Sequence, residues 1–338
     1  MTTWHDRWHA GHPLFLVLLP LSVLFAAVVA LRRLAWRRGW LSAWRAPVPV
    51  IVVGNLTVGG TGKTPLTLAL VERLQAAGWR PGIVSRGYGG STTYPAQVSV
   101  AALAAEVGDE PLLLARRTNV PVVVDPLRAR GVRALLAATD CNVVLCDDGL
   151  QHYALARDIE LVVIDGQRGL GSGWPLPAGP LREPASRLAE ADFVVVNGDW
   201  QAPGCAPAGA HVLRLQPGHW QPVPANASCS LDAADMMPEP PRPGDTVHAI
   251  AGIGNPGRFF SLLQRLGYHV LPQAFPDHHA YTAEDLRRQP PHPLVMTEKD
   301  AVKCAGIAPA ESWYLPVRAE LPDAFWSALL ARLDSWRP

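Results

Sequence analysis

Short apolar runs alternate with segments of helical periodicity along most of the chain after residue 46. The runs predict strands because they are brief, rich in Val and mostly end in Asp, Asn or Gly. They lie at 48–55, 81–90, 120–125, 142–148, 161–166 and 193–198. Between and after them we expect helices at 63–78, 109–118, 126–138 and 184–190. Strands this apolar, alternating with helices, predict a parallel sheet covered by helices on both faces.

The rest of the chain predicts a second, smaller α/β unit. Residues 201–245 are rich in Pro, Ala and Gly and show little periodicity beyond 211–216, which is typical of a linker or an irregular excursion. Apolar runs then resume, and we expect a final helix near 322–336. The chain is therefore divided into an N-terminal anchor, a first α/β domain, a linker and a C-terminal α/β lobe, at residues 1–45, 46–200, 201–245 and 246–338.

The N-terminal apolar run predicts a membrane segment. Residues 14–31 carry no charge, and as a helix they would span about 27 Å, close to the hydrocarbon thickness of a bilayer. We expect Pro20 to kink this helix, which membrane helices tolerate. Tryptophans flank both ends, as interfacial anchors do. More arginines follow the run than precede it, so the positive-inside rule places the body of the protein on the cytoplasmic side.

A signal peptide and a buried core helix are the alternatives for this run. No A-x-A cleavage pattern precedes the arginines, and the positive cluster follows the apolar run rather than leading it, which disfavours a signal peptide. The flanking Trp and Arg residues favour a membrane span or a deeply inserted anchor over a core helix.

Composition excludes several other classes. The 30 Lys and Arg are balanced by 29 Asp and Glu, which does not suggest a nucleic-acid-binding protein. The five cysteines form no C-x-x-C pair, and their number is odd. This argues against a zinc ribbon or a disulfide framework and fits a reducing compartment.

The stretch GNLTVGGTGKTPL, residues 54–66, predicts a phosphate-binding loop, since it follows a predicted strand and precedes a predicted helix. Thr57 stands where the usual motif has its first glycine, which is acceptable if the backbone there needs no positive φ. Lys63 would reach the β- and γ-phosphates of a nucleoside triphosphate, and Thr64 would offer its hydroxyl to Mg²⁺. Residues 46–200 are then a P-loop nucleotide-binding domain. The loop residues expected around the phosphates are Gly59, Gly60, Thr61, Gly62, Lys63 and Thr64.

A second motif, LCDDGLQH at 145–152, supplies acidic residues at the end of a predicted strand. An apolar strand ending in Asp is the Walker-B arrangement, in which a carboxylate holds Mg²⁺ directly or through water. Consecutive residues of a strand point to opposite sides, so Asp147 and Asp148 need not share one role. Which of the two binds the metal directly stays open.

Acid–base and cationic candidates complete the set. A kinase acting on a hydroxyl needs a group to orient or deprotonate it, and the candidates are Asp109 in GDEP and His278 or His279 in FPDHHAYT. Arg86 and Arg182 lie in predicted loops and are candidate contacts for phosphate or for a phosphorylated acceptor.

Eight motifs occur in an order that resembles the tetraacyldisaccharide 4′-kinase family, the lipid A 4′-kinases of Gram-negative bacteria. The resemblance runs from about residue 14 to 320. The motifs are GNxxxGGTGKTP, SRGYGG, GDEPLLLA, DDGLQH, LPAGPLREP, AGIGNPGRFF, FPDHHAYT and TEKDAVK. The family also shows the GGxGKT form of the phosphate loop, so Thr57 is no departure from it.

The resemblance implies an ATP-dependent transfer of phosphate to the 4′-hydroxyl of a lipid A disaccharide 1-phosphate, giving lipid IVA. It implies a P-loop kinase fold with a smaller α/β lobe, and an N-terminal anchor at the inner membrane with the catalytic body on the cytoplasmic side. The expected partners are ATP, Mg²⁺ and a glycolipid in the bilayer, with no nucleic acid and no protein partner required. By motif, the resemblance implies that Lys63 and Thr64 contact the nucleotide phosphates and Mg²⁺, and that Asp109 is the general base, paired with His278. It also implies that Asp147 and Asp148 lie near the metal, with Gln151 nearby. Arg86 and Arg182 are implied to contact the substrate or its phosphate.

Two other classes of protein share some of these features. A membrane-attached P-loop ATPase switch also carries GGxGKT, but its signature Lys before the glycines is Val58 here, and a switch has no need of the GDEP or DHH motifs. It would hydrolyse ATP under the control of a protein partner. A P-loop kinase for a soluble sugar or nucleotide is disfavoured by the apolar N-terminal run.

Overall fold

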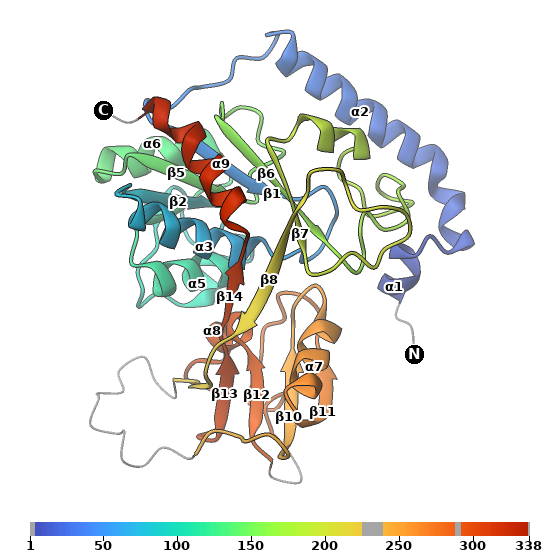
Figure 1. The fold of residues 1–338 in the computed structure, drawn as a ribbon, viewed down its shortest axis with the longest axis vertical. Helices are drawn as coiled ribbons and strands as arrows, with labels where there is room; N and C mark the ends of the chain where they lie inside the picture. The colour runs from blue at the N-terminus through green and yellow to red at the C-terminus, as the bar shows by residue number, and fades with distance from the viewer. Residues whose placement is uncertain (1–3, 225–238, 288–291, 337–338) are drawn as a thin grey trace.

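The computed structural model of the chain describes residues 4–224, 239–287 and 292–336. They form two lobes, a large one around a nine-stranded sheet and a small one around a five-stranded sheet (Figure 1). The predicted α/β class is confirmed, including helices on both faces of a largely parallel sheet.

The large sheet places the phosphate-loop strand near its centre. The strands lie in the order β14 (Val317–Glu320), β8 (His211–Pro217), β7 (Phe193–Asn197), β6 (Ile159–Asp165), β1 (Val50–Gly54), β5 (Val143–Asp147), β2 (Pro81–Ser85), β4 (Val122–Val124) and β3 (Ala96–Gln97). Both edge strands are antiparallel to their neighbours, and the other pairs are parallel. The chain leaves β1 on one side and later returns to the other, so a crevice opens at the carboxyl ends of β1, β5 and β6.

Alternation of apolar residues explains why this sheet is covered on both faces. Ile51 and Val53 of β1 pack in one hydrophobic cluster, whereas Val50 and Val52 pack in another. The first cluster includes α3 (Lys63–Ala76), α5 (Asp109–Thr118) and α9 (Asp323–Leu333), and the second includes α6 (Arg128–Ala138). The helix expected at 184–190 is a 3-10 helix, η2 (Ala185–Glu190), and a short helix α4 (Ala104–Val107) precedes α5.

The small lobe repeats the same layout on a smaller scale. Its strands lie in the order β11 (His269–Ala274), β10 (Thr246–Ala251), β12 (Leu294–Thr297), β13 (Ser312–Leu315) and β9 (Gln221–Pro222). Only the pair that β13 makes with β9 is antiparallel among the described strands of this sheet. Helices α7 (Pro256–Arg265) and α8 (Glu298–Cys304) pack on opposite faces of the sheet.

The course of the chain between the lobes differs from the predicted boundaries. Residues 201–245, expected to be an irregular linker, contribute β8 to the large sheet and β9 to the small one, while residues 225–238 lie outside the described residues. Residues after 316, expected in the C-terminal lobe, return to the large sheet as β14, and α9 packs on its core through Phe325. Pairing between distant strands decides this return, and local sequence patterns do not report it. A 3-10 turn, η4 (Asp334–Trp336), follows α9.

The N-terminal apolar run forms two consecutive helices after a short first helix, α1 (Trp4–His9). A 3-10 helix, η1 (Pro13–Leu18), leads into α2 (Leu19–Arg37), which runs along the outside of the large lobe (Figure 1). The expectation that Pro20 kinks the interior of the helix is wrong, because Pro20 lies in the first turn of α2, where its missing N–H breaks no helical hydrogen bond.

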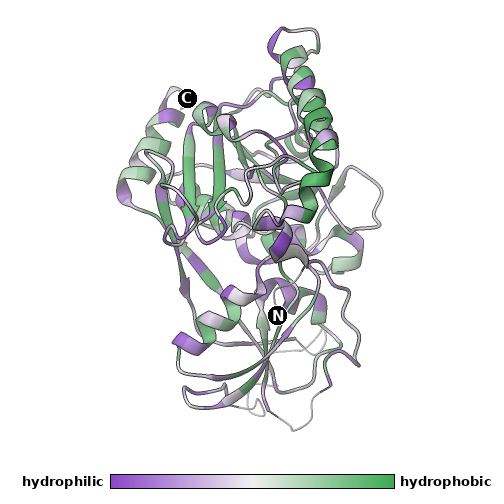
Figure 2. Cartoon of the chain, turned by 90° about the vertical axis from the view of Figure 1, so that its right-hand side faces the viewer, coloured by the Kyte–Doolittle hydropathy of each residue, from purple (hydrophilic) through white to green (hydrophobic). Residues whose placement is uncertain are grey.

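Helix α2 is not part of the core. The segment Pro13–Arg37 is long and apolar enough to cross a membrane, and 6% of its most apolar window is buried. Figure 2 shows its hydrophobic residues on the outside of the large lobe. The buried-core alternative for this run is therefore wrong.

Candidate active site

The phosphate loop joins β1 to α3 with glycines at the two points where the backbone requires them. Gly59 and Gly62 have φ values of 103° and 97°, and Gly62 caps α3, which begins at Lys63. Thr57 has no positive φ and pairs instead with Leu181 in an isolated bridge. The prediction that Thr57 can replace the first glycine is confirmed in conformational terms.

Gly60 of the phosphate loop contacts the small lobe. Its φ is not positive, but its backbone lies against Gly254 in the small lobe, where a Cβ on Gly254 would collide with the Gly60 backbone nitrogen. The turn AGIGN that follows β10 therefore touches the phosphate loop directly. This contact brings the small lobe to the carboxyl edge of the large sheet.

Lys63 lies in a polar cluster at the start of α3. Its Nζ lies 3.3 Å from Asn55 Oδ1 and 3.4 Å from Asp148 Oδ1. Arg182 Nη1 lies 3.2 Å from the same carboxylate oxygen. Burial alone would raise the pKa of Asp148, but Lys63 and Arg182 together hold it well below its usual range. Two cations thus share one ionised carboxylate at the mouth of the loop.

Asp147 has different surroundings from its neighbour. It is fully buried, its Oδ2 lies 3.5 Å from Ser85 Oγ, and its Oδ1 has no hydrogen-bond partner among the described residues. Burial, and then the charge of Glu110, raise the pKa of Asp147 to about 7. The two aspartates therefore occupy different environments, and Asp147 carries the oxygen without a partner among the described residues.

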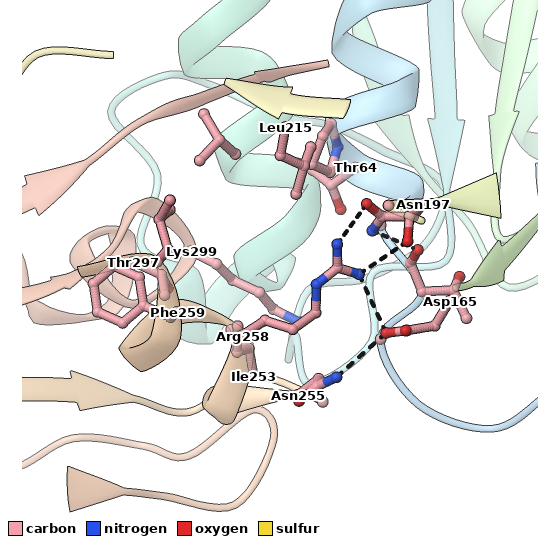
Figure 3. Close-up of a pocket in the computed structure, with 18 of the residues that line it drawn as sticks. Thr64, Asp165, Asn197, Leu215, Ile253, Asn255, Arg258, Phe259, Thr297 and Lys299 are labelled. Carbon is pink, nitrogen blue, oxygen red and sulfur yellow. Dashed lines mark hydrogen bonds and ion pairs between the residues drawn. The ribbon is translucent and has the colours of Figure 1, made fainter. Parts of the chain in front are cut away.

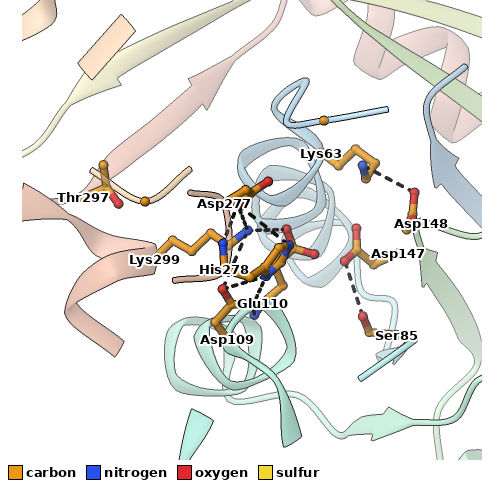
Figure 4. A network of polar contacts seen from close by, with 12 residues as sticks. Lys63, Ser85, Asp109, Glu110, Asp147, Asp148, Asp277, His278, Thr297 and Lys299 are labelled. Atoms are coloured by element: carbon orange, nitrogen blue, oxygen red, sulfur yellow. Dashed lines mark hydrogen bonds and ion pairs between the residues drawn. The ribbon is translucent and has the colours of Figure 1, made fainter. Parts of the chain in front are cut away.

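Asp109 and His278 come from different lobes and meet. His278 Nδ1 lies 3.0 Å from Asp109 Oδ2 and 3.1 Å from Oδ1 (Figure 4). Burial would raise the pKa of Asp109, but the hydrogen bond from His278, followed by the charge of Lys299, lowers it to about 2. Burial lowers the pKa of His278, but the hydrogen bond with Asp109 and the charge of that carboxylate together raise it by more. The pKa of His278 therefore lies above its ordinary value. His279 instead lies 3.2 Å from Asp285 and stacks on Phe275, so the geometry selects His278.

A cavity of about 310 Å³ collects most of the predicted residues. It opens between the phosphate loop and the Asp109–His278 pair, and Arg86 and Arg182 both line it. The Tyr88 ring lies 4.9 Å from that of His278 at its wall. Gln151 does not line it: its Nε2 donates to the carbonyl of Asn55, 3.2 Å away, at the root of the phosphate loop.

A larger cavity of about 650 Å³ lies on the other side of the loop, between the lobes. Loop residues 60–65, including Thr64, form one wall, and apolar side chains from both lobes line much of the rest. Arg258 of α7 lines this cavity. It donates to Asn197 Oδ1 at 2.9 Å and lies 3.3 Å from Asp165 Oδ2 (Figure 3). Asn197 in turn donates to the carbonyl of Thr61 at 2.9 Å, so the small lobe, two strand ends and the phosphate loop are linked.

Sequence reasoning missed several residues of this site. Arg128 is buried behind the Asp pair and donates to the carbonyl oxygens of Asp147 and Asp148 at 3.2 and 3.3 Å. Arg258 and Lys299 lie in two of the eight quoted motifs, but neither was assigned a role. Arg128 lies in the run LRARG, which resembles an ordinary charged helix face, so no local signal marks it.

Comparisons with known proteins give one consistent result. A family model described as LpxK, tetraacyldisaccharide-1-P 4′-kinase, matches residues 14–334. A tetraacyldisaccharide 4′-kinase of Alkalilimnicola ehrlichii is 55% identical over 94% of this chain and 93% of its own. One of Pseudomonas aeruginosa is 50% identical over 97% and 96%.

A solved structure is also similar. It is that of LpxK from Aquifex aeolicus in complex with ATP, and it has a TM-score of 0.73 and 28% identity to this chain. The match covers 95% of this chain and 99% of the Aquifex chain. The similarity therefore includes both lobes.

Proposed function

The chain belongs to the tetraacyldisaccharide-1-P 4′-kinase family, and we propose from this premise how its residues carry out the reaction. The chain is a kinase that uses ATP to phosphorylate the 4′-hydroxyl of a tetraacyldisaccharide 1-phosphate, the step that forms lipid IVA. The ATPase-switch alternative is not supported, since the family and its relatives are kinases. The arrangement that carries the mechanism is the cavity shared by Lys63, Arg182 and the Asp109–His278 pair.

The nucleotide is proposed to lie across the phosphate loop, with its nucleoside in the larger cavity. Backbone N–H groups at the start of α3 are free to bind phosphate oxygens, and the helix end adds partial positive charge. The Aquifex relative binds ATP, and its similarity spans this region of the chain. Apolar side chains such as Phe259 and Leu215 line the larger cavity, which suits a purine better than the polar 310 Å³ cavity does.

Mg²⁺ is proposed to bind beside Asp147 and Thr64. Among the described residues no group of three or more His, Cys, Asp or Glu side chains forms a closed metal site, which fits a metal held partly by nucleotide phosphates. The buried Oδ1 of Asp147 has no hydrogen-bond partner among the described residues, and a cation beside it would favour the ionised carboxylate and so lower its raised pKa. Asp148 is already engaged with Lys63 and Arg182. When bound, the ion would neutralise charge on the transferred phosphoryl group.

Asp109 is proposed to accept the proton of the acceptor hydroxyl. The 4′-oxygen forms a bond to the γ-phosphorus as the bond to the bridging oxygen of ADP breaks, and the proton moves to Asp109. A carboxylate with a low pKa is a weak base on its own, but the 3.0 Å contact lets His278 share the proton. The reactive form of the pair then has a neutral His278, and Lys63, Arg182 and Arg86 offset the charge on the phosphates.

The lipid substrate follows from the activity, and we propose that the N-terminal helices hold the enzyme on the cytoplasmic face of the inner membrane. An acylated sugar cannot leave a bilayer cheaply, at about 0.8 kcal/mol per exposed CH₂. Two hydrogen bonds attach helix α2 to the body: the backbone N–H of Ala178 donates to Ser22 Oγ at 2.8 Å, and Arg33 donates to Glu190 at 2.7 Å. These attachments favour a helix that dips into one leaflet along the body over one that crosses the membrane alone.

The anchor also approaches the site. Arg32 of α2 donates to the carbonyl of Gln151 at 3.3 Å, and the side chain of Gln151 reaches the root of the phosphate loop at Asn55. The proposed membrane face therefore lies beside the predicted catalytic residues, where a lipid acceptor would arrive.

A transfer assay tests the proposal. The protein and its Lys63→Ala variant are incubated with γ-labelled ATP, Mg²⁺ and a tetraacylated disaccharide 1-phosphate in detergent micelles. We expect label in the lipid with the parent and its loss with the variant, because Lys63 neutralises the transferred phosphate. An Asp109→Ala variant should also lose transfer, and near-normal turnover in that variant would exclude Asp109 as the base. Label released only as inorganic phosphate would contradict the proposed acceptor.

A further inference from the structure

Lys299 is a buried cation that the proposed mechanism does not use. It is the second residue of α8 in the small lobe, and its side chain is 14% exposed. Its Nζ lies 2.9 Å from Glu110, 3.2 Å from Asp277 and 3.8 Å from Asp109 Oδ2 (Figure 4). Burying an ammonium group is costly unless carboxylates surround it, so these three acids account for its position.

The three carboxylates come from both lobes, and one of them, Asp109, belongs to the proposed base pair. Asp109 and Glu110 begin α5 in the large lobe, whereas Asp277 precedes His278 in the small lobe. Lys299 does not line the 310 Å³ cavity where the acceptor would bind. It does line the larger cavity, but its ammonium group lies within 3.8 Å of all three acids. An effect on the reaction can pass through Asp109 and His278 or through a nucleotide in the larger cavity, and the ion pairs with the acids favour the first route.

Other charged groups also lie near the Asp109–His278 pair, but they do not take the place of Lys299 beside the three acids. Lys303 of α8 is farther along the helix and pairs with Asp300 at 2.9 Å. Across the cavity, two of the cations are held by Asp148. The groups that face the pair, besides the three acids, are Arg86, Tyr88, Lys63, Asp148, Arg182, Lys299 and Lys303.

We propose that Lys299 is a positioning residue for phosphoryl transfer: it draws Asp109, Glu110 and Asp277 together and keeps the Asp109–His278 pair free of its proton at neutral pH. The inference rests on the proposed role of Asp109 as the base. Without Lys299, three carboxylates would share the charge of one imidazole. Protonation of that imidazole and of Asp109 would then be favoured by the uncompensated negative charge.

Loss of the Lys299 charge should change the pH dependence of the reaction. The charge of Lys299 lowers the pKa of both Asp109 and His278. Its removal should raise both, so the pair holds its proton to a higher pH and the acidic limb of kcat/KM moves upward by about one pH unit. For Lys299→Met, we expect kcat/KM near pH 6 to fall about tenfold relative to the parent and the deficit to shrink above pH 8. Lys299→Arg keeps the charge and should retain the parental profile.

Glu298→Gln is the matched control. Glu298 precedes Lys299 and forms a two-oxygen ion pair with Arg117 of α5, at 2.6 and 2.7 Å. The change weakens the same junction between α5 and α8, yet Glu298 makes no contact with Asp109 or His278 among the described residues. We expect it to lower the melting temperature and to leave the acidic limb in place.

The outcomes separate the explanations. Lys299→Met and Glu298→Gln could lose activity equally at every pH, with the acidic limb of kcat/KM unmoved. That result would overturn the proposal and show that Lys299 only helps to hold the two lobes together. A raised KM for ATP with an unmoved limb would overturn it in favour of a nucleotide contact. Full turnover by Asp109→Ala would instead contradict the proposed role of Asp109 as the base. An inactive Asp109→Ala variant, together with an unmoved acidic limb in Lys299→Met, would overturn this inference alone.

A second measurement applies if Lys299→Met is inactive. The imidazole resonance of His278, assigned by its loss in His278→Gln, is titrated by NMR in the parent and in Lys299→Met. We expect a higher pKa in Lys299→Met, and an unchanged one would overturn the proposal.

Discussion

Asp147 and Asp148 are adjacent residues whose pKa values are shifted in opposite directions by their surroundings. The pKa of Asp148 is held low by Lys63 and Arg182, whereas burial raises that of Asp147 to about 7. A sequence pattern gives the positions of both acids but not these surroundings, because the cations come from loops far apart in the chain. Only the structure therefore distinguishes Asp147 as the carboxylate with an unpaired oxygen.

The raised pKa of Asp147 predicts a pH dependence of stability in the protein without nucleotide or metal. In the unfolded chain the group loses its proton near 4, and in the folded state near 7. Between these values the folded state binds more protons, so the free energy of unfolding should decrease as the pH rises from about 4 to about 7. Asp147→Asn should remove this part of the dependence.

Melting temperatures of the parent and Asp147→Asn between pH 5 and pH 8 test this. We expect the parent to lose more stability than the variant over the range, and added MgATP to reduce the difference. Parallel curves for the two proteins would show that Asp147 does not titrate there.

At the same residue scale, the sequence located the residues of the loop and the Asp109–His278 pair, because each lies in a distinctive motif. It left open the choice between His278 and His279, which depends on which ring faces Asp109 across the lobe boundary. It missed Arg128, because the arginines of the run LRARG look like a solvated helix face, although Arg128 itself is buried behind β5.

At the scale of elements, short apolar runs predicted six of the nine strands of the large sheet, because these strands bury apolar side chains on both faces. It did not predict that β14 and α9 return to that sheet, since this depends on pairing with β8. Nor did it predict that η1 precedes α2, which moved Pro20 to the first turn of the helix.

Helix α2 gives the prediction that belongs to this scale. Leu24 is 62% exposed on the outer side of the helix, so Leu24→Glu should weaken binding to vesicles while leaving the melting temperature within about 1 °C. A charge placed in the hydrocarbon region costs about 2.5–3.5 kcal/mol on insertion scales. The measurement is co-sedimentation with vesicles of zwitterionic and anionic phospholipids.

Leu271→Glu is the control for this prediction. Leu271 is 41% exposed on β11 in the small lobe, away from the N-terminal helices. The same chemical change there should leave vesicle binding intact. Equal losses from both variants would show that added negative charge, rather than insertion of α2, controls binding.

At the scale of the whole molecule, both cavities are lined by residues of the two lobes. The acceptor cavity takes His278 from the small lobe and Asp109 from the large one, and the larger cavity is crossed by Arg258. The sequence predicted that two lobes exist and that their motifs belong together, but motif order carries no information on how the lobes face each other. That arrangement depends on contacts such as Gly60 against Gly254.

Arg258 joins the lobes and therefore gives a prediction about both nucleotide binding and lobe contact. It bonds to Asn197, which holds the phosphate loop at Thr61, and it pairs with Asp165, which is 2% exposed. Arg258→Ala leaves that buried carboxylate with one cationic partner fewer. Loss of a charged hydrogen bond of about 1.5–3 kcal/mol should raise the Kd for ATP by about 10- to 100-fold.

The matched control is Arg265→Ala on the same helix, which removes an arginine that lines the same cavity but makes no ion pair among the described residues. It should change the Kd less than threefold, by calorimetry with a non-hydrolysable ATP analogue. The acidic limb of kcat/KM should not move in either variant, because neither arginine contacts Asp109 or His278. A Kd unchanged by Arg258→Ala would mean that the nucleoside does not use the larger cavity, and a shifted limb would mean that loosening the lobe contact also displaces His278 from Asp109.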